Sequence, residues 1–164
     1  FRDFINHLLT IRGKPLDYVD YNLRYKFGKD IAYREVIPSL GHETNISFDI
    51  EFTLNNNFRL KPIISYQDIK KINSDEYFFK GYIGRLDLRY QFNNTLDIRL
   101  IGEYNDFSDE LFFQPLVSWR PDPDTIFYLG GNQNYIKDFP DYNSPIYMAN
   151  QSQIFLKFQY LIKS

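Results

Sequence analysis

Apolar and polar residues alternate along this chain in runs that are long for β-strands. Between Val19 and Phe27 every odd position is apolar or aromatic and every even position is polar or charged. The same two-residue period returns over 46–54, 86–92, 96–100 and 154–162. Because successive side chains of a strand point to opposite sides of a sheet, each run predicts a strand with one apolar and one polar face.

The full pattern predicts nine strands and no helix. We expect the strands at 2–11, 16–27, 45–54, 58–68, 77–92, 95–105, 111–120, 125–135 and 152–163, with a short extra strand at 31–36. Residues typical of turns fill the short links Arg12-Gly13-Lys14-Pro15, 55–57, 93–94 and 121–124. The longer links are 28–44, 69–76, 106–110 and 136–151.

Short and long links alternate along the chain, which is typical of bacterial outer-membrane β-barrels. Their periplasmic turns are short and their extracellular loops are longer. The pattern therefore predicts an antiparallel transmembrane β-barrel of the meander type, with the C-terminus on the periplasmic side.

Aromatic residues reach 19% of the chain, and their positions predict two belts. Outer-membrane barrels carry such girdles where lipid meets water. The belt expected near the short turns contains Tyr25, Phe27, Phe52, Phe58, Tyr90, Phe92, Trp119 and Tyr160. The belt expected near the long loops contains Tyr66, Tyr77, Phe78, Tyr82, Tyr104 and Tyr135.

The mean hydropathy of −0.45 is too polar for a bundle of membrane helices. A spanning strand needs only about 9–11 residues, of which half can be polar. The alternative is a soluble, lipocalin-like barrel with its apolar face inward around a small apolar ligand, because alternation alone does not say which face lies inside. Predicted strands of ten or more residues exceed the soluble average of about 5–6 and favour the membrane.

The 164 residues are expected to form a single β-barrel segment. Nine strands is an odd number, whereas single-chain bacterial barrels have even numbers, and an open sheet in lipid leaves backbone groups unsatisfied. The chain opens on Phe1-Arg2-Asp3-Phe4 without the features of a signal peptide, which an outer-membrane protein must have, so a mature chain or a C-terminal fragment is expected. We therefore expect a C-terminal part of a larger barrel, or a wall that other chains complete.

Candidate chemistry is sparse, and we expect neither an enzyme, a cofactor nor a metal site. The chain has no cysteine, and His7 and His42 lack partner motifs. An outer-membrane hydrolase would need a Ser/His or acid/His cluster at the loop rim, where His42 is the sole histidine. The oxygen-rich segment 105–110 matches no calcium loop. A net charge of −2 with scattered basic residues argues against nucleic acid.

The inward polar face offers the best candidate site, a ladder of mixed charge. If Phe92 pairs with Leu96, then Arg85 lies opposite Glu103. Such charges can screen solutes, but bracing a polar lumen is the stronger interpretation, and both signs together predict no ion selectivity. The predicted lumen-facing ladder is Arg85, Asp87, Arg89, Asp97, Arg99 and Glu103, with Asp87 close to Arg99 by the diagonal.

The segments 82–92, 96–105, 114–116, 125–130 and 153–161 together resemble a known family. They are similar to the last strands of large outer-membrane proteins in which a family-9-like carbohydrate-binding module precedes a C-terminal barrel of unknown function. The resemblance covers residues from Phe79 onward and implies a membrane anchor for a larger, glycan-related surface protein. That family establishes no functional residue in its barrel, so none is transferred, and sugar binding is assigned to no residue here.

The last strand resembles the signal that the barrel-assembly machinery reads. Ile154, Leu156, Phe158, Tyr160 and Ile162 share one face, although the chain ends in Ser164 rather than in phenylalanine. The sequence thus predicts a non-enzymatic, porin-like barrel in the outer membrane of a Gram-negative bacterium. It would act as an anchor and as a passage or docking wall. Its expected partners are membrane lipids, the assembly machinery and other outer-membrane subunits.

Overall fold

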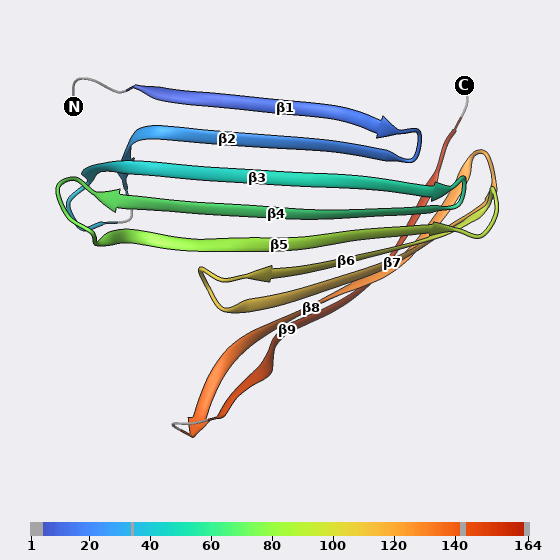
Figure 1. Cartoon of the computed structure of the whole chain (residues 1–164). Helices are drawn as coiled ribbons and strands as arrows, with labels where there is room; N and C mark the ends of the chain where they lie inside the picture. Colours follow the sequence, from blue (N-terminus) through green and yellow to red (C-terminus); the bar gives the residue numbers. More distant parts are fainter. Residues whose placement is uncertain (1–4, 34, 142–143, 163–164) are drawn as a thin grey trace.

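The computed structural model describes residues 5–33, 35–141 and 144–162 as one antiparallel sheet. Its strands lie in sequence order, β1 to β9, and each pairs with the next, so the topology is a pure meander (Figure 1). The strands are β1 (Asn6–Leu16), β2 (Val19–Ala32), β3 (Ser39–Asn55), β4 (Phe58–Lys71), β5 (Tyr77–Gln91), β6 (Leu96–Asn105), β7 (Glu110–Asp122), β8 (Thr125–Asp141) and β9 (Ser144–Tyr160). The all-β, antiparallel prediction is confirmed.

The sheet is open, and its nine strands do not close into a barrel (Figure 1). Figure 1 shows β1 to β5 side by side, whereas β6 to β9 bend away from them, and β1 and β9 stay apart as free edges. In a meander of nine strands β1 and β9 run in the same direction. Closing this sheet on itself would therefore need a parallel ladder, unlike the eight antiparallel ladders that it contains.

The first turn lies later than the sequence predicts. Strand β1 continues through Gly13 and Pro15 to Leu16, which pairs with Val19 across a turn at Asp17 and Tyr18. The ladder shifts between Gly13 and Leu16, which accommodates a proline that has no N–H to donate. The Tyr21 ring covers the outer side of Gly13, so this glycine serves packing rather than a turn.

The two longest predicted links are mostly strand. Strand β2 passes through Gly28 to Ala32 and β3 begins at Ser39, so the described residues of 31–36 form no separate strand. Likewise β8 reaches Asp141 and β9 begins at Ser144. In both places a backbone ladder pairs residues whose polarity suggested a loop, and the predicted strict alternation of link lengths is wrong.

The register places most apolar side chains on one face and most charged side chains on the other. Apolar residues also lie among the charges of the second face: Ile63, Ile83, Ile101, Phe112 and Leu116. One continuous row runs through Val19, Phe52, Leu60, Leu88, Leu100 and Pro115. We call the face that carries this row the outer face. The opposite, inner face carries the row of Arg59, Arg89 and Arg99 together with most of the acidic side chains.

Burial shows which face is crowded. Nine of the described residues are buried, and all but Asp68 belong to the inner face: Ala32, Gly41, Glu43, Asp68, Ile69, Gly81, Ile101, Ser118 and Gly130. Outer-face side chains such as Ile154 (85% exposed) and Leu156 (75%) are open to the surroundings. The sheet thus curls with its polar face inside, and its apolar face forms the exposed exterior.

Candidate functional site

The predicted charge ladder lies on the inner face, and its central pairs form. Arg85 is opposite Glu103 in the register, and its Nη1 lies 3.1 Å from Glu103 Oε2. The backbone N–H of Phe92 donates to Leu96 O at 3.0 Å, which fixes the predicted register at this turn. These two contacts confirm the pairing, while the role of the ladder in a lumen stays a prediction.

The remaining predicted residues of the ladder lie in the same part of the inner face. Arg99 Nε is 3.6 Å from Asp87 Oδ2, which is the predicted diagonal contact. Asp97 instead pairs with Arg120 of β7, at 3.4 Å between Oδ1 and Nη2. Arg89 is exposed and lies between two other arginines rather than beside a carboxylate.

The ladder extends beyond the predicted residues onto β2, β3 and β4. Lys61 Nζ lies 3.4 Å from Asp49 Oδ2, and Arg59 Nε lies 3.1 Å from Glu51 Oε1. The amide of Asn22 also donates to Asp49 at 3.0 Å. The Asn22–Asp49 contact depends on the β2–β3 register, which cannot be counted across a link predicted at 28–44. The two β3–β4 pairs depend on a register that shifts by a bulge between Thr53 and Asn55, which alternation does not reveal. The alternating charges of 20–26 and 49–61 were the available signal.

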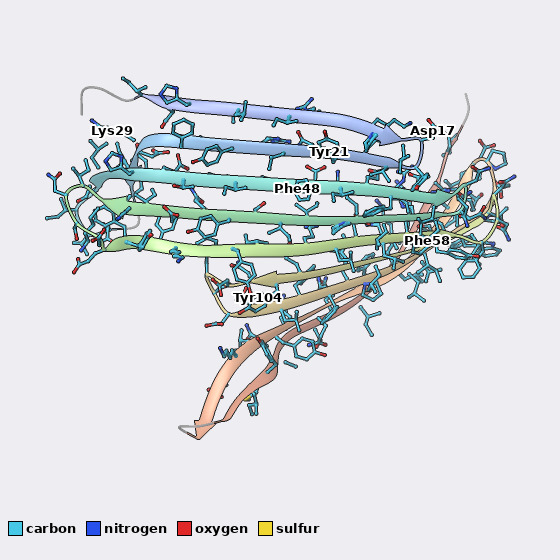
Figure 2. The ribbon with its side chains drawn as sticks, viewed as in Figure 1. Asp17, Tyr21, Lys29, Phe48, Phe58 and Tyr104 are labelled. Carbon is cyan, nitrogen blue, oxygen red and sulfur yellow. The ribbon has the colours of Figure 1, made fainter. Side chains whose placement is uncertain are left out.

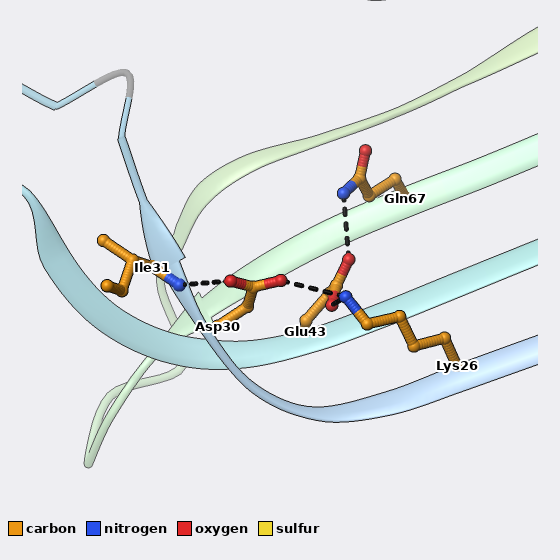
Figure 3. A network of polar contacts seen from close by, with 5 residues as sticks. All are labelled: Lys26, Asp30, Ile31, Glu43 and Gln67. Carbon is orange, nitrogen blue, oxygen red and sulfur yellow. Dashed lines mark hydrogen bonds and ion pairs between the residues drawn. The ribbon is translucent and has the colours of Figure 1, made fainter. Parts of the chain in front are cut away.

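A denser polar network lies at the loop end of the inner face. Figure 3 shows the Lys26 ammonium between Asp30, at 3.0 Å, and Glu43, at 2.5 Å. Gln67 of β4 donates to Glu43 Oε1 at 3.0 Å, and the Asp30 side chain accepts the backbone N–H of Ile31 at 2.7 Å. The Glu43 side chain is only 2% exposed, so its charge depends on these partners. The network joins three neighbouring strands, and the buried Ile69 lies opposite Glu43 in the register.

Two aromatic belts lie on the outer face. The turn-end belt runs across the sheet from β4 to β9, with ring-centre distances of 6.4 Å for Phe58–Tyr90 and 5.0 Å for Phe127–Phe158. Figure 2 labels Phe58 at this end and Tyr104 toward the other end. The loop-end belt includes the Tyr82–Tyr104 pair, at 5.7 Å. Its further ring contacts are Tyr25–Phe27, His7–Phe27 and Phe113–Tyr135.

Two aromatic residues belong to the opposite belt from the one predicted. Tyr25 and Phe27 lie at the loop end, because β2 starts at the first turn and runs away from it. Their partners in β1 are Leu9 and His7, and His7 stacks on Phe27 with ring centres 5.0 Å apart. Phe27 and His7 thus belong to a ring stack on the outer face, and no catalytic partner of His7 is found in the described part of the chain.

On β4, β5 and β8 the two belts have the same spacing along the strand. Phe58 and Tyr66, Tyr82 and Tyr90, and Phe127 and Tyr135 are each eight positions apart. At about 3.3 Å per residue this spacing is roughly 27 Å along a strand, and about 20 Å once a tilt near 40° is allowed for. The aromatic rings at both ends increase the height of the band above this projected distance. The apolar band therefore has dimensions close to the ~25 Å apolar band of outer-membrane barrels.

The β4–β5 connection carries exposed charge pairs beyond the loop-end belt. Lys70 and Lys71 contact Asp75 and Glu76, each at 2.7 Å. The hydrogen bond from each lysine lowers the pKa of its partner, Asp75 or Glu76, below the usual value. Both carboxylates stay ionised at neutral pH, so this hairpin tip is a charged, water-exposed end.

Neither a metal nor a membrane-spanning helix is indicated by the described residues. No group of three or more His, Asp or Glu side chains lies close enough together to hold a metal ion within that part of the chain. Asp109, from the oxygen-rich segment, instead accepts the Tyr104 hydroxyl at 3.2 Å and contacts Lys137. Residues 5–33, 35–141 and 144–162 contain no helix long and apolar enough to cross a membrane.

Comparison with protein families, with curated proteins and with solved structures finds no match to this chain. The resemblance of the residues from Phe79 onward to barrels that follow a carbohydrate-binding module therefore stays a prediction.

Proposed function

We propose that this chain is part of the wall of a bacterial outer-membrane β-barrel, with no enzymatic role. It anchors a larger surface protein or complex in the membrane and contributes to a passage or a docking wall. One observation carries the proposal. The crowded inner side of the curled sheet carries the cross-strand ion pairs and most of the charged side chains, whereas the exposed outer side is mainly apolar.

A soluble, lipocalin-like barrel needs the reverse arrangement. Its apolar side chains lie inside around the ligand, and its charged side chains face water. Here Ile101 is the one large side chain that is fully buried within the described residues, and large apolar side chains are exposed on most strands. Such an extensive exposed apolar surface is costly in water and favourable in lipid.

The proposal also assigns an orientation. The C-terminal end of β9 lies at the same end of the sheet as the β1–β2 turn (Figure 1), where three of the four links are two residues long. At the other end the first three links are four to six residues long. In an outer-membrane barrel the side of the short turns is periplasmic. Strand β9 would present its apolar residues to the barrel-assembly machinery, and the charged β4–β5 tip would face the outside. In lipid the free edges of β1 and β9 must be paired, with each other or with other subunits.

Trp119 provides a direct test without any change to the chain. It is the one tryptophan of the sequence, is 49% exposed and stacks on Phe127 in the turn-end belt. We expect its fluorescence to shift to the blue when the chain folds into phosphatidylcholine vesicles. Lipids brominated near the headgroup should quench it more strongly than lipids brominated near the acyl-chain end, because the belt lies at the interface.

A matched variant moves the probe to the middle of the band. Leu86 lies four residues from both Tyr82 and Tyr90 on the outer face and is 41% exposed. In the double variant Trp119→Phe/Leu86→Trp, quenching should be strongest with bromine deep in the bilayer. Absence of quenching in both proteins, with a folded chain that stays monomeric in plain buffer, would contradict the membrane proposal and favour the soluble barrel.

A further inference from the structure

Three arginines stand side by side on the inner face. The register places Arg59 of β4 opposite Arg89 of β5, and Arg89 opposite Arg99 of β6. Directly opposed residues in antiparallel strands have Cβ atoms about 4.5–5.5 Å apart, and like charges at such positions destabilise a sheet. This row therefore requires a compensating interaction.

The carboxylates around the row do not supply that interaction for Arg89. Four ion pairs lie in or beside the arginine row: Lys61–Asp49, Arg59–Glu51, Arg99–Asp87 and Arg120–Asp97. Each carboxylate is matched to one cation other than Arg89. Among the residues that the structure describes, Arg89 has no ion pair, and it is exposed on the inner face. The surplus positive charge is thus at the centre of the row.

The flanking arginines also retain donors. Glu51 makes its closest approach to Arg59 at Nε, and Asp87 makes its closest approach to Arg99 at Nε. A guanidinium has five N–H donors in a planar fork that matches carboxylate and phosphate oxygens. Three such forks in one row can surround a single oxyanion and replace their mutual repulsion by charge-assisted hydrogen bonds.

We propose that the Arg59–Arg89–Arg99 row is a binding site for the phosphate or carboxylate group of a small water-soluble anion. The proposal rests on the proposed function for the access of solutes along a water-filled inner face. It deepens that function, because it assigns the passage a class of solute that the mixed charge of the ladder alone does not indicate. Arg89 is the residue on which the site depends most.

Calorimetric titration with inorganic phosphate tests the site in the folded chain, held in a neutral detergent without phospholipid. We expect saturable binding that equal concentrations of chloride do not reproduce. Arg89→Gln should weaken it at least about tenfold, and Arg89→Lys, which keeps the charge but loses the fork, by a few-fold. Arg24→Gln is the matched control, because Arg24 is an exposed inner-face arginine of β2 that faces Thr10 and Ser47. It should change binding less than about twofold.

A stability measurement distinguishes an anion-binding site from a row of arginines that merely repel one another. Arg89→Gln should melt at a higher temperature than the native chain without phosphate, and should lose the stabilisation that phosphate gives the native chain. No saturable phosphate binding, or equal weakening by Arg24→Gln and Arg89→Gln, would overturn the site. If vesicle insertion succeeds and phosphate binding fails, only the site is wrong. If phosphate binds in plain buffer and insertion fails, only the membrane proposal is wrong.

Discussion

Replacing Ile154 with arginine should destabilise the chain in lipid vesicles by about 2–4 kcal/mol, the cost of a basic side chain at the bilayer midplane. Ile154 is 85% exposed on the outer face and lies opposite Gly131. Gly131 is four positions from both Phe127 and Tyr135, which belong to the two belts. Ile154 thus occupies the middle of the apolar band. Urea unfolding in phosphatidylcholine vesicles, followed by Trp119 fluorescence, measures the change.

The neighbouring position provides the control for this prediction. Gln153 lies on the same strand but on the inner face, where its side chain accepts a hydrogen bond from Asn132 at 3.2 Å. Gln153→Arg places the same charge in water and should cost less than about 0.5 kcal/mol, as surface substitutions usually do. Equal effects of the two substitutions, or an Ile154→Arg chain that gains stability in plain buffer, would mean that the outer face does not contact lipid.

Gly41→Ala should destabilise the sheet by about 2–4 kcal/mol, the range for overpacking with backbone displacement. Gly41 is buried on the inner face, and a Cβ there would lie 2.6 Å from the backbone oxygen of Lys70, besides meeting the Ile69 side chain. A backbone atom cannot move aside without disturbing the β3–β4 ladder. Thermal or urea unfolding of the folded chain in detergent measures the loss.

The outer face should respond in the opposite direction. Gly84 has no atom within 4 Å of the position that its Cβ would take. Gly84→Ala should therefore stabilise the chain by about 0.5 kcal/mol, since alanine has less backbone freedom to lose on folding. The opposite effects expected for Gly41→Ala and Gly84→Ala test which face of the sheet lies inside. A sheet that curled the other way would make Gly84 the sensitive position and Gly41 the tolerant one.

The two faces could be predicted from the sequence, because the face of a strand residue depends only on whether its position is odd or even along the strand. Alternation from Val19 to Phe27 fixes which side chains share a face, whatever the exact ends of the strand. The Arg85–Glu103 pair was also predictable. The short link after Phe92 left little freedom in the register, so counting outward from Leu96 gave the correct partners.

The predicted strand ends are wrong where polar residues belong to strands. Asp138 and Lys137 pair with Ile146 and Tyr147, so the polar end of β8 is a strand that extends past its partners in β7. The ladder hydrogen bonds are made by backbone N–H and C=O groups, so polar residues can continue a strand that apolar residues began. The Lys26–Glu43–Gln67 network was hidden for the same reason, because residues 28–44 were predicted to be a loop rather than two paired strands.

The direction of curling could not be predicted from the pattern. Alternation is identical in a barrel with its apolar face outside and in one with that face inside. The structure adds the burial of Gly41, Ile101 and Ser118 on the polar side, and this burial depends on how nine strands pack rather than on any one of them. The spacing of eight residues between Tyr82 and Tyr90 was visible in the sequence, but its meaning depended on both residues facing outward.

The central claim is that the apolar outer face contacts lipid and the polar inner face contacts water. The chain has no cysteine, so single cysteines can be placed at each position from 153 to 158 and spin-labelled in vesicles. We predict that accessibility to oxygen peaks at Ile154, Leu156 and Phe158. Accessibility to a water-soluble nickel chelate should peak at the alternate positions 153, 155 and 157. Equal access of the nickel chelate to both sets would contradict the claim.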